Sequence, residues 1–433
     1  MAPADHDFRT AGPDALAAAL RASRADTLAT LAHINAVLPD LQVPQHDTSN
    51  PPRWELGHIG WFAQHWLARN PQRQRGTQAD PQAPRSLARA PDSDALFDSS
   101  RVPHSSRWHL ALPGVAALRE SLEEGLRVTL GLLQHGDDSR SDSDSDSHSD
   151  SHSDSALYFH RLVLAHEDMH HEAALCLAQA LGLPALHDGN DRVDVPPRWQ
   201  ASRLDAPRHL LAFDAAPFDQ GWRGAGFAFD NELGAFTTTV PAFEIDSRVL
   251  SWADYLPFAE AGGYRQARWW CSAGRAWLRS SGAQGPRYLR GSPWQVQVGG
   301  QWQALDVTLP ACHLNAFEAE AWCAWAGRRL PSESEWERAA AHVNGQPGGQ
   351  PGGQAAPALA WGAVWEWTCS PFTPYPGFVA HPYQDYSAPW FGSRRVLRGA
   401  SFATQKRLHH LRYRNFYTPE RNDIFAGFRS CAL

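Results

Sequence analysis

The chain has 433 residues with 39 basic and 46 acidic side chains, a formal net charge of -7, and an apolar fraction of 43%. One hydrophobic core stops growing well below this length, so we expect two domains. The acidic balance and the lack of any basic run argue against a nucleic-acid-binding protein.

The sequence contains no segment with the composition of a membrane span or a signal peptide. No run of 18 apolar residues occurs, and residues 1–14 carry charges instead of an apolar core. The six cysteines show no CxxC spacing and are too sparse for a disulfide scaffold. We therefore expect a cytoplasmic protein with free thiols and no membrane partner.

The first 200 residues predict a bundle of helices. Apolar residues at helical spacing indicate one helix over residues 13–38 and another over residues 115–133. A helix capped by Asn50 lies between them, and it is apolar on both sides, so we expect it to be buried on both sides. A last helix ends near Gly182. Long helices of this kind commonly build metal sites from side chains that face one another.

A low-complexity segment separates the last two helices. Residues 137–155 repeat Ser and Asp, with two histidines among them. Such a composition cannot bury enough apolar surface to offset its ordering entropy, so we predict a disordered surface loop.

Two histidines on the last helix form a candidate metal clamp. His166 and His170 are four residues apart, so they share one helix face, and that face is otherwise apolar. A buried imidazole pair needs polar partners, and a divalent metal serves both rings at once. His58 is the best candidate for a third ligand, with His65 as its rival. Glu172 lies about 200° of helical rotation beyond His170, so it would not bind the metal directly. We expect it to contact one of the metal ligands or to form an ion pair.

Residues 201–433 differ from the first 200 in composition and in the pattern of apolar residues. Pro, Gly and Trp are frequent, helices are short, and aromatic residues alternate with polar ones, which predicts a loop-rich α+β domain. The pattern indicates helices over 316–325 and 333–342. Short strands are expected at three places: 365–368, 395–399 and 426–429.

Two sets of motifs resemble known families. The His58 helix and the His166-xxx-His170-x-Glu172 motif resemble a DinB-like helix bundle, which covers residues 1–200. Residues 201–433 resemble the formylglycine-generating-enzyme or sulfatase-modifying-factor domain, which has a C-type-lectin-like fold. The motifs that carry the second resemblance are EAWCAWAGRRLP (320–331), EWE (335–337), VWEWT (364–368), LRGAS (397–401) and GFR (427–429).

This combination is similar to the sulfoxide synthases of ergothioneine biosynthesis, a family that includes selenoneine synthases. The resemblance implies iron(II) on His58, His166 and His170, with hercynine, O2 and a thiol or selenol donor as the small-molecule partners. It also implies that Asn415 and Phe416 hold hercynine. Formylglycine-generating enzymes use a cysteine pair near the positions of His410 and Asn415, and its absence here argues against oxidation of a protein cysteine.

Two tyrosines follow a Pro-Gly-Phe element, as in family members of the mycobacterial type. Tyr383 matches the tyrosine that acts as the proton donor, and Tyr386 is the second of the pair. A tyrosine can act as a general acid although its ordinary pKa is about 10.

The chain departs from the family at positions that contact the sulfur donor. Tyr417 stands where users of γ-glutamylcysteine have Asp, Asn422 follows Arg421 where they have a second Arg, and Met169 replaces a Gln. We therefore expect Tyr417 and Arg421 to contact a different donor, cysteine or a selenosugar. The sequence leaves the choice between sulfur and selenium open.

Three other functions are compatible with parts of the sequence. One is a zinc-dependent DinB-like thiol transferase, because simpler bundles use the same three histidines. A second is an ovothiol-type 5-histidylcysteine sulfoxide synthase. The third is a binding module in which the lectin-like half holds a sugar or peptide. The second domain and Tyr383 argue against the transferase, because it needs neither.

Overall fold

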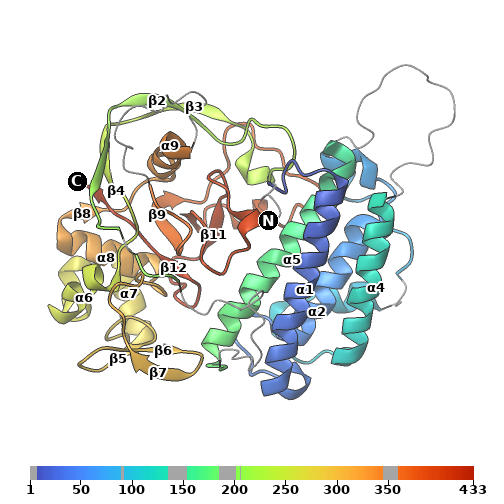
Figure 1. Ribbon diagram of the computed structural model, residues 1–433, viewed down its shortest axis with the longest axis horizontal. Helices are drawn as coiled ribbons and strands as arrows, with labels where there is room; N and C mark the ends of the chain where they lie inside the picture. The colour runs from blue at the N-terminus through green and yellow to red at the C-terminus, as the bar shows by residue number, and fades with distance from the viewer. Residues whose placement is uncertain (1–6, 89–91, 135–153, 185–200, 205, 345–358) are drawn as a thin grey trace.

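A helical part and a part of mixed helices and strands lie side by side in the computed structural model (Figure 1). The described residues are 7–88, 92–134, 154–184, 201–204, 206–344 and 359–433. None of the helices in these ranges is long and apolar enough to cross a membrane. All six cysteines are free, as the sequence predicted.

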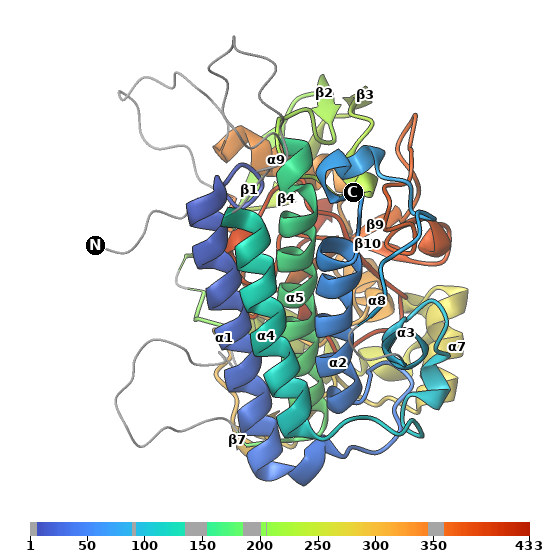
Figure 2. The same cartoon turned by 90° about the vertical axis from the view of Figure 1, so that its right-hand side faces the viewer.

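The helical part is a bundle in which four long helices run alongside one another (Figure 2). Each of these helices was predicted by its apolar spacing, and the structure confirms them. A short fifth helix packs against the second one and carries Phe97 at its end. The helices are α1 (Pro13–Val37), α2 (Pro52–Ala63), α3 (Ser93–Phe97), α4 (Val115–Gln134) and α5 (Asp154–Ala180).

Helix α2 is buried on all sides. Every residue of α2 except Arg53 is buried, which agrees with the apolar character of both its faces in the sequence. Its N-cap is Pro51, so the prediction of Asn50 as the capping residue is wrong: Asn50 lies one residue outside the helix. A π-helical turn, Gln64–Ala68, continues α2 without a break.

The predicted disordered segment overlaps α5. Residues 137–153 lie outside the described residues, but Asp154 and Ser155 form the first turn of α5, so their assignment to a loop was wrong. The Asp154 carboxylate accepts hydrogen bonds from Arg161 Nη1 at 2.9 Å and from the Gly226 backbone N–H at 2.8 Å. An acidic residue in a first turn also stabilises the helix through its dipole.

The second part is built from short strands in four small sheets with helices around them. The strand orders are β1-β4-β13-β8, β11-β10-β9-β12, β2-β3 and β5-β6-β7. Its helices are α6 (Trp252–Glu260), α7 (Ser272–Ser281), α8 (Ala316–Ala326) and α9 (Glu333–Asn344). The strands are β1 (Leu210–Phe213), β2 (Ala216–Gln220), β3 (Phe236–Val240), β4 (Phe243–Asp246), β5 (Leu289–Arg290), β6 (Gln295–Val298), β7 (Gln301–Ala304), β8 (Arg328–Arg329), β9 (Trp365–Pro371), β10 (Arg395–Arg398), β11 (Asn415–Tyr417), β12 (Ala426–Gly427) and β13 (Cys431–Ala432).

Two of the sheets reach α5: Trp365 of β9 contacts its middle, and Gln297 of β6 contacts its C-terminal end (Figure 1). β10 pairs antiparallel with β9 and β11, whereas β12 runs parallel to β9. The predicted helices over 316–325 and 333–342 are present as α8 and α9. The three predicted strand segments are present as β9, β10 and β12.

Helix α5 joins the two parts. The Asp168 carboxylate on α5 accepts hydrogen bonds from Arg407 Nε and Nη2, both at 2.6 Å. One turn later, the partly buried Glu172 carboxylate accepts hydrogen bonds from Trp365 Nε1 at 2.9 Å, Ser401 Oγ at 2.6 Å and Thr404 Oγ1 at 2.7 Å. The second part is therefore fixed to α5 by two acidic side chains, one turn apart.

Candidate metal centre

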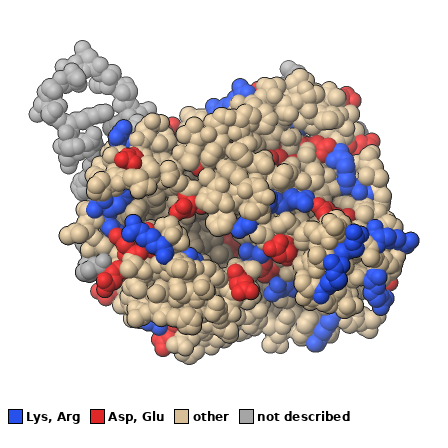
Figure 3. All heavy atoms as spheres, turned by 180° about the vertical axis from the view of Figure 1, so that it is seen from behind, with Lys and Arg blue, Asp and Glu red and all other residues tan. Residues whose placement is uncertain are grey.

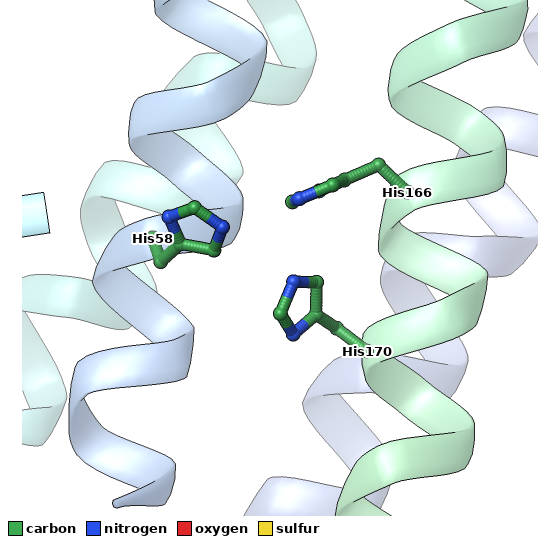
Figure 4. A group of neighbouring side chains, drawn as sticks. All are labelled: His58, His166 and His170. Atoms are coloured by element: carbon green, nitrogen blue, oxygen red, sulfur yellow. The ribbon is translucent and has the colours of Figure 1, made fainter. Parts of the chain in front are cut away.

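Three histidines from α2 and α5 point toward one another inside the bundle (Figure 4). One ligand nitrogen from each of His58, His166 and His170 lies within 4.8 Å of the other two. The ring centroids are 5.0 Å apart for His58 and His166, 5.1 Å for His58 and His170, and 4.5 Å for His166 and His170. No other group of three or more such side chains occurs in the described part of the chain.

The ring of His58 is held by its neighbours on α2 and by α3. His58 Nδ1 lies 2.8 Å from the carbonyl oxygen of Phe97, so Nδ1 carries the proton and donates it there. Trp54 stacks on the ring with a centroid distance of 4.7 Å and an interplanar angle of 11°. This arrangement leaves His58 Nε2 available to a ligand.

The other two rings are also prepared for metal binding. His166 stacks on Phe62 at 3.6 Å, and its Nε2 is buried without a hydrogen-bond partner among the described residues. Burial lowers the pKa of His58 and of His166 well below the usual value, and the neighbouring His170 adds to the shift in both. Neutral imidazole is the form that binds a metal. The donor set fits a divalent metal that accepts imidazole nitrogen.

His65 lies outside this group. It sits in the π-helical turn, where its ring contacts Trp61 at 4.9 Å and Trp66 at 5.0 Å. Burial lowers the pKa of His65 to about 4, so this histidine is also neutral. The geometry therefore favours His58 over His65 as the third ligand, as the sequence indicated.

A cavity of about 260 Å³ opens beside the histidines, between α5 and the second part. On the face shown in Figure 3, a hollow lies near the middle of the molecule, with Lys, Arg, Asp and Glu side chains around it. A larger hollow of about 710 Å³ between α2 and α4 is lined by none of the three histidines. The side chains that line the smaller cavity include His166, His170, Tyr383, Tyr386, Tyr417 and Arg421.

Tyr383 reaches the cavity beside His166. Its ring contacts Phe62 edge-on at 4.9 Å and His166 at 6.3 Å. Burial raises the pKa of Tyr383, and the nearby Asp385 raises it further, so the hydroxyl keeps its proton at neutral pH. A protonated hydroxyl at this place can supply a proton to a reacting group in the cavity.

Tyr386 packs against residues of the second part and against Met169. Its ring stacks on Phe229 at 4.4 Å, and its hydroxyl lies 3.8 Å from Met169 Sδ on α5. Burial raises the pKa of Tyr386, and Tyr413 adds to the shift. Both predicted tyrosines therefore line the cavity, with Tyr383 closer to the histidines.

Residues 415–417 form the edge strand β11. Tyr417 lines the cavity, and Asn415 shares its strand face because the two are two residues apart. Asn415 and Phe416 are not among the residues that line the cavity. Phe416 stacks on Phe372 at 4.0 Å and contacts Tyr386 edge-on at 5.8 Å. The assignment of Asn415 and Phe416 to hercynine binding stays a prediction.

The positive charge of Arg421 is paired inside the cavity wall. Its Nε and Nη2 donate to the Asp423 carboxylate at 2.5 and 2.9 Å, and its guanidinium lies 4.9 Å from the centre of the Tyr417 ring. Thr48 Oγ1 also donates to Asp423, at 2.8 Å. Asn422 does not line the cavity, and its Oδ1 accepts a hydrogen bond from Arg287 at 3.0 Å.

Comparison with known proteins agrees with this architecture. The Sulfatase-modifying factor enzyme 1-like domain family matches residues 208–355 and 359–432. Hercynine oxygenase from Mycolicibacterium thermoresistibile is 32% identical over 422 residues, which cover 88% of this chain and 86% of that protein. The chain belongs to the hercynine oxygenase family. This is the ergothioneine sulfoxide synthase family that the motifs resemble.

Two further relatives show how far each similarity extends. Hercynine oxygenase from Mycobacterium tuberculosis is 31% identical, and the match covers 96% of this chain and 98% of that protein. Formylglycine-generating enzyme from Streptomyces coelicolor is 28% identical, but the match covers only 48% of this chain and 83% of that protein. The similarity to hercynine oxygenases thus includes the helical part that carries the three histidines.

The structure brings residues to the site that the sequence did not single out. Glu55, on the same helix as His58, lies against His170, and Asp230 holds the loop that carries the two tyrosines. Glu172 was expected as an outer partner of the metal or an ion-pair residue. It instead binds Trp365, Ser401 and Thr404, because its helix face points toward the second part. No spacing in the sequence indicates these contacts, since each of them joins residues that are far apart along the chain.

Proposed function

We propose that this protein is an iron(II)- and O2-dependent enzyme that joins a thiol or selenol donor to the imidazole C2 of hercynine. The observation that carries the proposal is the group of three inward-facing histidines beside a cavity with a protonated tyrosine, in a chain of the hercynine oxygenase family. The product would belong to ergothioneine or selenoneine biosynthesis.

His58, His166 and His170 would hold the iron. Iron(II) bound there would supply the oxygen activation. Tyr383 would deliver a proton to the reacting oxygen, while Tyr386 packs behind it. The stacked rings of Trp54, Phe62 and their neighbours exclude water from the histidine side of the site.

The cavity supports a donor other than γ-glutamylcysteine. Arg421 is the only Lys or Arg side chain among the described residues that line the cavity, and Asp423 already pairs with it. Carboxylates of a γ-glutamyl group would therefore be desolvated without a free cation. Tyr417 offers a hydroxyl to the hydroxyl groups of a selenosugar, and cysteine is the smaller alternative.

Tyr383 and the similarity over both parts of the chain favour this function over a zinc-dependent thiol transferase. Zinc in such a site performs no O2 chemistry. An ovothiol-type enzyme would join sulfur to the imidazole C5 of histidine instead, so the position of the new bond distinguishes the two reactions.

The test is metal analysis of anaerobically purified protein, followed by O2 uptake with hercynine and each donor. We expect bound iron, O2 uptake that needs both substrates, and a new bond at C2. We also expect kcat/KM for γ-glutamylcysteine to be about a hundredfold or more below that of the preferred donor. Zinc without O2 uptake would favour the transferase, and similar rates for all donors would contradict the assignment of the cavity.

A further inference from the structure

Glu55 lies beside the histidine group without belonging to it. Its side chain is buried, and its Oε1 is 3.4 Å from His170 Nδ1. The group of mutually close ligand atoms includes the three histidines but not this carboxylate. Figure 4 shows one ring nitrogen of His170 turned toward His58 and His166 and the other turned away. Glu55 therefore contacts His170 on the side away from the candidate metal.

The Glu55 carboxylate is itself held in place. Asn50 Nδ2 donates a hydrogen bond to Glu55 Oε1 at 3.1 Å, and Asn50 Oδ1 accepts one from Arg107 Nη1 at 2.7 Å. Arg107 is anchored in turn by the carbonyl oxygen of Val102, at 3.1 Å from Nη2. A chain of hydrogen bonds thus runs from the connector before α4 to the acid beside His170.

Arg107 reaches the metal ligands by a second route. Its guanidinium lies 3.9 Å from the centre of the Trp54 ring, and Trp54 stacks on His58. The same arginine therefore supports His170 through Asn50 and Glu55, and His58 through Trp54. Arg107 and the residues it contacts thus lie outside the histidine group, where they can orient two of its members, His58 on α2 and His170 on α5.

We propose that Glu55 is a positioning residue that accepts the Nδ1 proton of His170 and so fixes the tautomer that presents Nε2 to the metal. The carbonyl oxygen of Phe97 has the same relation to His58 Nδ1. His170 Nδ1 is buried and has no hydrogen-bond partner among the described residues, and Glu55 Oε1, 3.4 Å away, needs to approach by only a few tenths of an ångström to accept its proton. The inference rests on the proposed metal centre and adds a residue that acts on it through His170.

The experiment titrates metal-free protein with cobalt(II) alone and reads the affinity and the visible absorption spectrum. Glu55→Ala should lower the cobalt affinity about 10- to 100-fold, because the outer partner of a ligating histidine is lost. Glu55→Gln should lower it less, because its amide oxygen can still accept the Nδ1 proton. Glu172→Gln is the matched control, a partly buried acid near His170 whose hydrogen bonds go to the second part, and it should bind cobalt like the wild type.

Wild-type affinity in Glu55→Ala would overturn the inference. So would equal losses in Glu55→Ala and Glu55→Gln with a changed coordination number in the cobalt spectrum, because Glu55 would then be a ligand. If Glu55→Ala fails to fold, ¹⁵N NMR of the zinc-loaded wild type decides by itself: a proton on Nδ1 of His170 supports the inference, and a proton on Nε2 overturns it. Failure of the wild type to bind cobalt would instead refute the metal centre.

Discussion

Replacement of Glu172 tests how the two parts of the protein are joined. Its carboxylate accepts three hydrogen bonds, two at Oε1 from Trp365 and Ser401 and one at Oε2 from Thr404. Glu172→Ala leaves all three donors without their acceptor in a buried place. Each unsatisfied buried donor costs about 1–3 kcal/mol.

The expected loss of stability in Glu172→Ala is smaller than the cost of three unsatisfied donors. Ser401 Oγ and Thr404 Oγ1 are already 3.2 Å apart, so one hydroxyl can donate to the other, and Trp365 Nε1 and the second hydroxyl are the donors left unpaired. We therefore expect a loss of about 3–5 kcal/mol in the free energy of unfolding, including the cavity left by the side chain. Glu172→Gln keeps Oε1 for two donors and turns its amide toward Thr404, so it should lose about 1 kcal/mol.

The assay is urea unfolding of wild type, Glu172→Ala and Glu172→Gln, followed by circular dichroism of the helices and by tryptophan fluorescence. The two signals should separate in Glu172→Ala, because one of the two acidic contacts between the parts is lost and only the Asp168 contact with Arg407 remains. Equal losses in the two variants, or a loss below about 1 kcal/mol in Glu172→Ala, would refute this account of the contact.

Three other predictions concern the site and the loop beside it. His58→Ala should lose most bound iron while His65→Ala keeps it, as measured by metal analysis, and the reverse result would make His65 the ligand. Tyr383→Phe should lower the ratio of coupled product to oxidised donor about 10²- to 10⁴-fold at unchanged iron content, and a shift in Tyr386→Phe alone would assign the proton to Tyr386. Burial lowers the pKa of His381 from 6.5 to about 4. Unfolded protein therefore binds the proton more readily between these values, and the free energy of unfolding should fall by about 3 kcal/mol as the pH drops from 6.5 to 4. His381→Gln should remove this part of the slope in urea unfolding, and an unchanged slope would contradict it.

The sequence was informative where the signal is local. His166 and His170 share a helix face because they are four residues apart, and the apolar residues around them showed that this face is buried. The bundle helices were recognisable for the same reason. The prediction of His58 as the third ligand also required the buried character of its helix and the family resemblance. Its position beside His170 depends on how two helices pack, which no local pattern shows.

Contacts between distant segments could not be predicted. Asp168 and Arg407 are 239 residues apart, and no periodicity relates them. The role of Glu55 could not be predicted, because it lies on a helix that is buried on all sides and burial therefore does not distinguish it from its neighbours. Asn50 was assigned to helix capping because its residue type favours that role, whereas Pro51 takes the capping position and frees the Asn50 side chain to bind Glu55.

Helix α5 also limits how the gene could be recombined. His166 and His170 face the cavity, while Asp168 and Glu172 face the second part, all within two turns. A chimera that takes all bundle helices from one relative and residues 201–433 from another would place a foreign surface against α5. A functional exchange therefore has to keep the residues of the second part that bind α5, which are Arg407, Trp365, Ser401 and Thr404.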